Sequence, residues 1–108
     1  MKKLEFEGTS LEDLKNFPPE ARREAGHQLH MVQIGENPTD WKPMETIGAG
    51  VKEIRVHIAG EWRVLYVTKL LEAVYVLHVF SKNSKVTRTI DKDLAKRRYQ
   101  DLINRLRK

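Results

Sequence analysis

The residues best suited to chemistry in this chain are basic side chains that recur at every second position in its second half. Arg55, His57 and Arg63 occupy alternate positions of two short segments with strand periodicity, so all three are expected on one face of a sheet. Cations fixed on a sheet can hold a phosphate group and offset the charge that develops on it in a transition state. The same pattern is typical of an ordinary solvated sheet face, and both interpretations stay open at this point.

Other side chains near this basic face could take part in the same chemistry. Glu53 and His57 belong to it and are able to transfer protons, and His78 lies near the end of a later strand. Tyr66 or Tyr99 could stack on a base or donate a hydrogen bond. Further cations follow the last strand or lie on the last helix, namely Lys82, Lys85, Arg88, Lys96, Arg97 and Arg98. The last three form either an RNA-binding rim or a solvated helix face.

The register of the expected hairpin follows from its hydrophobic pattern. Apolar and polar residues alternate on both sides of residues 59–61. A three-residue loop at 59–61 pairs Ile58 with Trp62 and Val56 with Val64, and it gathers the apolar side chains on one face. The charged side chains, Glu53 included, are then expected together on the opposite face.

A helical hairpin is expected before these strands, over residues 9–34. Thr9 and Glu12 have the spacing of a capping box, and Gly35 is a stop signal. The remaining expected elements are a short strand at residues 44–47, a central strand at 73–80 that is apolar throughout, and a last helix that begins near Asp91. This order predicts a small α+β domain.

Composition bounds the function of the chain. Its 108 residues suit one domain, 1–108, and no apolar run approaches the length of a membrane helix. The chain contains no cysteine, which excludes disulfides and thiolate zinc sites, and the cytoplasm is the expected compartment. His27 and His30 share a helix face without a third ligand, so no metal site is expected. Residues 1–54 carry a net charge of −3 and residues 55–108 a net charge of +8, which favours a polyanionic partner.

The order and spacing of several motifs resemble the phage-derived branch of the RelE/HigB toxin superfamily. The resemblance covers nearly the whole chain, from Leu11 to Arg98. Its motifs are residues 14–22 (LKNFPPEAR), 32–35 (VQIG), 44–55 (METIGAGVKEIR), 60–66 (GEWRVLY) and 74–82 (VYVLHVFSK). The resemblance implies a microbial-ribonuclease-type α+β fold in which two N-terminal helices pack on a small antiparallel sheet, with a C-terminal helix.

The same resemblance implies a function. Members are toxins of type II toxin–antitoxin pairs that cleave mRNA, commonly on the ribosome, without a metal or other cofactor. The 2′-hydroxyl attacks the adjacent phosphate, and basic side chains stabilise it. The implied positions are Arg55, Arg63, Lys82 and Lys85, with Tyr66 and His78 nearby. The general base is Glu53, His57 or His78.

Partners and alternatives follow from these expectations. The implied partners are mRNA, the ribosome and a cognate antitoxin, a HigA-like helix-turn-helix protein, with no membrane involved. We expect that antitoxin to bind the helical first half, because DNA-binding antitoxins often carry basic surface and this half is net negative. The alternatives are a non-catalytic RNA- or protein-binding module on the same fold, and a protein whose main role is to hold a partner, with basic residues that merely solvate it.

Overall fold

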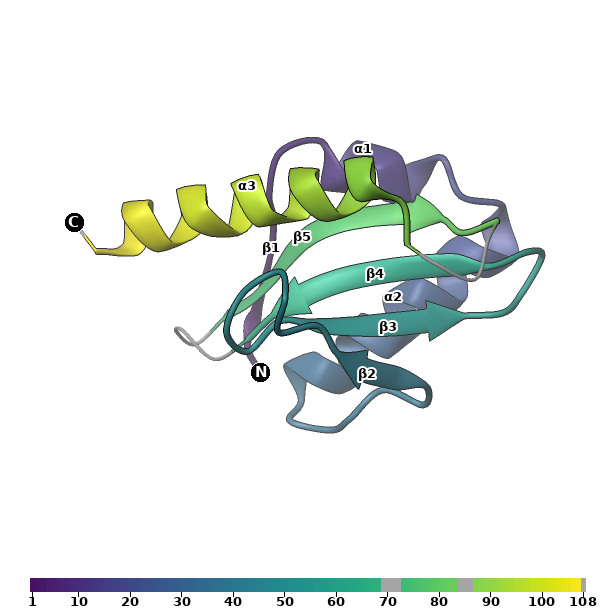
Figure 1. Cartoon of the computed structure of the whole chain (residues 1–108). Helices are drawn as coiled ribbons and strands as arrows, with labels where there is room; N and C mark the ends of the chain where they lie inside the picture. Colours follow the sequence, from purple (N-terminus) through teal and green to yellow (C-terminus); the bar gives the residue numbers. More distant parts are fainter. Residues whose placement is uncertain (69–72, 84–86, 108) are drawn as a thin grey trace.

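The chain folds into a sheet whose two faces are covered unequally by helices (Figure 1). The computed structural model describes residues 1–68, 73–83 and 87–107. Within these ranges the strand order is β1-β5-β4-β3-β2. In chain order the elements are β1 (Lys3–Phe6), α1 (Ser10–Lys15), α2 (Pro19–Gln33), β2 (Trp41–Pro43), β3 (Lys52–Val56), β4 (Trp62–Val67), β5 (Ala73–Ser81) and α3 (Thr89–Leu106).

The helices α1 and α2 pack on one face of the sheet because their apolar residues recur at helical spacing. Ala21, Ala25 and Leu29 of α2 are fully buried, in one cluster with strand residues such as Val64 and Val76. The helical hairpin that the sequence predicted is therefore confirmed, and Figure 1 shows α2 behind the sheet.

The start of α1 does not use the predicted capping box. Thr9 precedes the helix, but its side chain makes no capping hydrogen bond to the backbone. Its hydroxyl instead donates to the Asp13 carboxylate at 3.0 Å and accepts from Arg98 at 3.1 Å. A contact with the distant helix α3 thus replaces the local cap. Gly35 adopts a φ of +88° just beyond α2, as expected for a helix stop.

A strand that the sequence analysis did not anticipate, β1, precedes the two helices. It pairs in parallel with β5, from Lys3 opposite Ala73 to Phe6 opposite Val76. The other neighbouring strands are antiparallel, so the sheet is mixed. The α+β class is confirmed, but the expected arrangement of two N-terminal helices on an antiparallel sheet is corrected by β1. A segment of four alternating residues is too short for its periodicity to predict a strand.

The register of the β3–β4 hairpin differs by two residues from the predicted one. Val56 pairs with Trp62, so residues 57–61 form the turn instead of 59–61. A shift of two residues keeps every side chain on its expected face, which is why the pattern could not exclude it. Ile58 leaves the ladder and is 40% exposed, while its carbonyl accepts a hydrogen bond from the Trp62 indole at 3.0 Å.

The second face of the sheet is covered by α3, which packs along β5 (Figure 1). Ala95 and Leu102 of α3 are fully buried, in a cluster with Leu65 and Leu77. Because α3 runs along β5, it does not extend over the outer strands β3 and β2 on this face (Figure 1), and we call this side of the sheet the open face. None of the helices in the described ranges is long and apolar enough to cross a membrane.

The outermost strand on the open side, β2, lies at Trp41–Pro43, not at residues 44–47 as predicted. Met44 and Ile47 are instead buried in the turn that follows, in the same cluster as the apolar side of α3. The pairing of β2 with β3 brings Lys42 opposite Glu53. The true position of β2 therefore adds a lysine to the charged face.

Candidate phosphate-binding site

Charged side chains on the open face converge on one buried carboxylate. Glu53 of β3 has no exposed surface. Its Oε1 atom lies 3.5 Å from Nε of Arg55 and 3.8 Å from Nε of Arg63. The same oxygen lies 3.9 Å from Nζ of Lys42. Three adjacent strands thus position three cations around one anion.

Lys82 adds a fourth cation from just beyond β5. Its backbone N–H donates to the Glu61 carbonyl at 2.8 Å, which fixes the chain where the strand ends. Burial lowers the pKa of the Lys82 amine, Glu53 opposes this effect, and neighbouring cations lower the pKa further. Those cations are Arg63, Lys42 and Arg55. We refer to Lys42, Arg55, Arg63 and Lys82 as the cation cluster.

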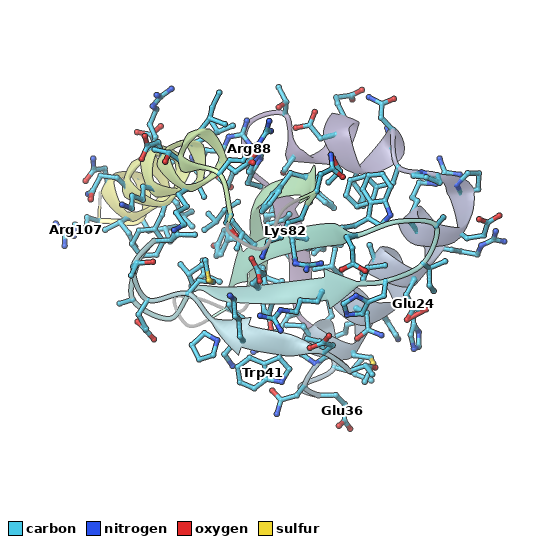
Figure 2. All side chains as sticks on the ribbon, turned by 45° about the vertical axis from the view of Figure 1, so that its right-hand side comes forward. Glu24, Glu36, Trp41, Lys82, Arg88 and Arg107 are labelled. Carbon is cyan, nitrogen blue, oxygen red and sulfur yellow. The ribbon has the colours of Figure 1, made fainter. Side chains whose placement is uncertain are left out.

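The members of the cation cluster differ in their access to solvent. The side chains of Lys42 and Arg55 are 39% and 32% exposed, whereas that of Arg63 is 9% exposed. The Nη1 atom of Arg63 donates to the Trp62 carbonyl and to Glu61 at 3.0 and 3.1 Å. Lys82 lies over the middle of the open face, between Arg88 beside α3 and Trp41 at the β2 edge (Figure 2). A ligand on this face would meet Lys42, Arg55 and Lys82, with Arg63 as a fixed charge beneath them.

Most of this site was predictable from the sequence, but Lys42 was not. Glu53, Arg55, Arg63 and Lys82 were predicted and do lie together. Lys42 could have been found only from a correct position for β2, because its proximity to Glu53 depends on strand pairing. Lys85 was also predicted, and it lies outside the described residues.

His57 lies at the edge of this site, in the turn between β3 and β4. Its Nε2 atom is 2.6 Å from Oδ2 of Asp40, and its Nδ1 atom is 2.8 Å from Oε1 of Glu61. Hydrogen bonds to Asp40 and then Glu61 raise the pKa of His57. The hydrogen bond from His57 also lowers the pKa of Glu61. His57 is thus engaged with two carboxylates and is not a free imidazole.

His78 lies on the open face because β5 carries a bulge. Leu65 pairs with His78, but the next residue, Tyr66, pairs with Val76, so Leu77 has no partner on β4. His78 is 6% exposed, and its Nε2 atom lies 2.8 Å from Oδ1 of Asp91 in the first turn of α3. Burial lowers the pKa of His78, and the hydrogen bond to Asp91 opposes this effect.

The Asp91 carboxylate also contacts Arg88, which the sequence predicted to bind RNA. The Nε atom of Arg88 donates to Asp91 at 3.1 Å, while the Arg88 side chain stays 69% exposed. His78, Asp91 and Arg88 therefore connect β5 to the start of α3. This connection gives His78 a structural role at the margin of the cation cluster.

The positions of two predicted RNA-binding residues do not favour that role. Tyr66 is 1% exposed and belongs to the core cluster on the α2 side of the sheet, and burial raises its pKa to about 12. A side chain on that face cannot contact a ligand on the open face. Arg98 donates to the Leu77 carbonyl at 3.0 Å and to Thr9 at 3.1 Å. It therefore satisfies the carbonyl at the bulge, which is a structural contact.

The neighbours of Arg98 on α3 keep the expected exposure. Lys96 and Arg97 are both exposed, as a solvated face or an RNA-binding rim requires. In the parts of the chain that the structure describes, no group of three or more histidine or carboxylate residues is arranged to hold a metal ion.

A comparison with known families identifies the chain. Residues 12–100 match the family described as "Phage derived protein Gp49-like (DUF891)". The chain belongs to the phage-derived Gp49-like family. No curated protein matches the sequence closely enough to count as a relative. The Gp49-like match begins within α1 and covers all of α2, every residue of the cation cluster and most of α3.

Proposed function

We propose that this Gp49-like protein is a toxin of RelE/HigB type, an endoribonuclease that cleaves mRNA without a metal ion and thereby inhibits translation. The observation that carries the proposal is the cation cluster around Glu53 on the open face of the sheet. Four cations around one carboxylate give these five side chains a net charge of +3, and the site stays positive when its neighbours Asp40, Glu61 and His57 are counted, which suits a phosphodiester better than a neutral or cationic ligand. The Gp49-like family and the resemblance of the motifs support the toxin assignment.

The proposed reaction is an attack by the RNA on itself. The 2′-oxygen forms a bond to the adjacent phosphorus while the bond from phosphorus to the 5′-oxygen breaks, which leaves a 2′,3′-cyclic phosphate and a 5′-hydroxyl. Negative charge grows on the phosphate oxygens and on the leaving oxygen. Arg55 and Lys42 contact the phosphate in this proposal, with Arg63 beneath them. Preorganised cations of this kind stabilise such charge because they need no reorganisation during the reaction.

Lys82 is the proposed proton donor to the leaving 5′-oxygen. It lies on the open face among the other cations (Figure 2). Burial and its cationic neighbours lower the pKa of its ammonium group, which makes the group a stronger acid. The proton of the 2′-hydroxyl leaves to solvent in this scheme.

Three residues were expected from the sequence as candidates for the general base, and the surroundings of each do not favour that role. Glu53 is fully buried beneath the cations that surround it. His78 is 6% exposed and is bonded to Asp91. His57 contacts carboxylates through both ring nitrogens. The proposal therefore rests on phosphate stabilisation.

The test is cleavage by purified protein together with inducible expression. Wild type should arrest growth and cut ribosome-bound mRNA, whereas Arg55→Ala should lose at least ~10²-fold in cleavage rate, the order of magnitude for removal of one transition-state contact. Lys15→Ala is the matched control, because Lys15 is an exposed cation on α1 that does not belong to the cation cluster. A harmless wild type that leaves ribosome-bound mRNA intact would exclude this function.

A second candidate is a non-catalytic RNA-binding module on the same fold. The observation in its favour is the engagement of all three candidate bases described above. This candidate predicts salt-sensitive RNA binding through the cation cluster, without any product. Binding and cleavage measured on the same preparation distinguish the two candidates.

The proposed partners follow from the first candidate. mRNA on the ribosome is the substrate, and a cognate antitoxin of HigA-like helix-turn-helix type keeps the toxin inactive in the cell that makes it. The open face binds RNA in this proposal, so the α1–α2 face stays available for the antitoxin.

A further inference from the structure

Three carboxylates and three basic side chains form a closed ring of alternating charge at the edge of the site. Its inner half is Glu53 with Arg55 and Arg63, at 3.5 and 3.8 Å from the shared Oε1 atom. Its outer half consists of contacts from Arg55 to Asp40 (4.0 Å), Asp40 to His57 (2.6 Å), His57 to Glu61 (2.8 Å) and Glu61 to Arg63 (3.1 Å). The members come from β3, β4, the turn between them and the residue before β2.

His57 completes this ring only in its protonated form. Both of its nitrogens face carboxylate oxygens, and a neutral imidazole has one N–H to donate. In a neutral ring, one nitrogen lone pair would face a carboxylate oxygen at less than 3 Å. That repulsion would free Asp40 or Glu61 to move closer to an arginine.

The outer carboxylates act on the arginines that the proposed function assigns to phosphate. The two arginines lie opposite each other and share Glu53. Asp40 contacts the guanidinium group of Arg55 and Glu61 contacts that of Arg63, so these two carboxylates orient the guanidinium groups. Asp40 is also tied to β3 through its carbonyl, which accepts from the Arg55 backbone N–H at 2.9 Å. His57 is 51% exposed, yet its hydrogen-bonding nitrogens point along the ring and not outward to a ligand.

We propose that His57 is a positioning residue that holds Asp40 and Glu61 as a brace for Arg55 and Arg63, so that RNA affinity depends on the protonation of His57 through these two carboxylates. This inference rests on the proposed RNA-binding function. It differs from the sequence prediction, in which His57 contacts RNA itself.

The charge of the site gives the direction of the effect. With His57 protonated, the ring is neutral and Lys42 and Lys82 leave a net charge of +2. With His57 neutral, the net charge falls to +1, and the released carboxylates compete with phosphate for the arginines. RNA affinity should therefore fall as the pH rises through the pKa of His57. Exposed ion pairs of this kind are individually weak, so we expect a loss of about fivefold.

The experiment measures binding of a uniformly 2′-O-methylated single-stranded RNA, which has no 2′-hydroxyl and cannot be cleaved. Affinity is measured by fluorescence anisotropy at constant salt at about pH 6 and about pH 8.5, on either side of the histidine range. The variants are His57→Gln and the double variant Asp40→Asn/Glu61→Gln. His30→Gln is the matched control, an exposed histidine on α2 away from the ring. NMR titration of His57 in wild type and in the double variant accompanies the binding data.

The expected result is an affinity that falls about fivefold with rising pH in wild type and in His30→Gln. The fall should be absent in His57→Gln and in the double variant, and the pKa of His57 should decrease in the double variant. A fall that persists in the double variant but is absent in His57→Gln would show direct contact of His57 with RNA and overturn the inference. A fall that persists in both variants would come from another group, such as Lys82, and would overturn it as well. A wild type without the fall would overturn it as well. Failure to cleave ribosome-bound mRNA, with the pH pattern intact, would instead remove only the proposed nuclease activity.

Discussion

Arg55 and Arg63 lie directly opposite each other on β3 and β4, although like charges at paired positions of a sheet repel. The Oε1 atom of Glu53 lies within 3.8 Å of the Nε atoms of both. Glu53 is fully buried, and among the described residues its second oxygen has no hydrogen-bond partner. The carboxylate therefore holds the arginine pair together from below, which leaves the open face to present positive charge.

Replacement of this carboxylate should destabilise the fold. Glu53→Gln leaves the arginine pair and Lys42 without their common counter-ion, and loss of one partner from a buried ionic cluster costs about 3 kcal/mol. The measurement is the free energy of unfolding in urea. Glu36→Gln, at an exposed position between α2 and β2, is the control and should change stability by less than ~0.5 kcal/mol. Equal stability of the two variants would contradict the counter-ion role.

Lys42 should contribute directly to RNA binding, although the sequence did not single it out. Its side chain is 39% exposed beside Glu53 and Arg55. Lys42→Ala should weaken binding of single-stranded RNA and reduce the slope of log affinity against log salt by about 0.7, the value for one phosphate contact. Lys15→Ala removes the same charge from α1, outside the cation cluster, and should leave the slope unchanged. Identical slopes for the two variants would mean that the open face is not where RNA binds.

Arg97 and Arg98 are neighbours on α3 that should behave in opposite ways. Arg98 bonds the Leu77 carbonyl at the β5 bulge, so Arg98→Ala should cost about 2 kcal/mol of unfolding free energy. Arg97 is exposed, and Arg97→Ala should leave stability unchanged. Thermal or urea unfolding of the pair decides this point. A stable Arg98→Ala would show that the bulge does not depend on this contact.

The fold was predictable from sequence wherever a period was long enough to be read. The buried stripe of α2, the apolar strand β5 and the alternation of β3 and β4 all gave correct elements. Shorter or indirect signals failed. β1 has four residues, β2 has three, and the hairpin register was ambiguous because a shift by two residues conserves both faces.

The candidate site was predictable in its composition but not in its roles. The alternating pattern identified Arg55 and Arg63, because a strand sends alternate residues to the same face. The roles of His78 and Arg98 depend on the bulge in β5, which no local pattern announced. Tyr66 lies in the core with its apolar neighbours. The same alternation predicted this position, because it places Tyr66 on the face of the sheet opposite Arg63. Burial of Glu53 depends on packing between strands that are separated in the sequence.

His78 should make the stability of the protein depend on pH below neutrality. Burial lowers the pKa of folded His78, so the unfolded chain binds a proton at a higher pH than the folded chain does. Its stabilising contribution is complete above the unfolded value near 6.5 and is lost as the pH falls through the lower folded value. The folded pKa of His57 is raised, so its stabilising contribution is instead complete below the unfolded value near 6.5 and is lost as the pH rises through the folded value. The free energy of unfolding, measured in urea between about pH 5 and 7, should fall with decreasing pH in wild type and fall less steeply in His78→Gln. Equal slopes would contradict the assignment.

An antitoxin should bind the α1–α2 face and leave the cation cluster free. Residues 1–54 carry a net charge of −3, which would attract the basic surface of a DNA-binding partner. Charge reversal at the exposed start of α2, Glu20→Lys, should therefore weaken the complex, whereas Lys82→Ala on the open face should bind as tightly as wild type. Calorimetric titration with an antitoxin of the proposed type gives both affinities. The comparison is informative because each variant changes a charge on only one face of the sheet. A large loss for Lys82→Ala, with Glu20→Lys unaffected, would mean that the antitoxin covers the RNA-binding face itself.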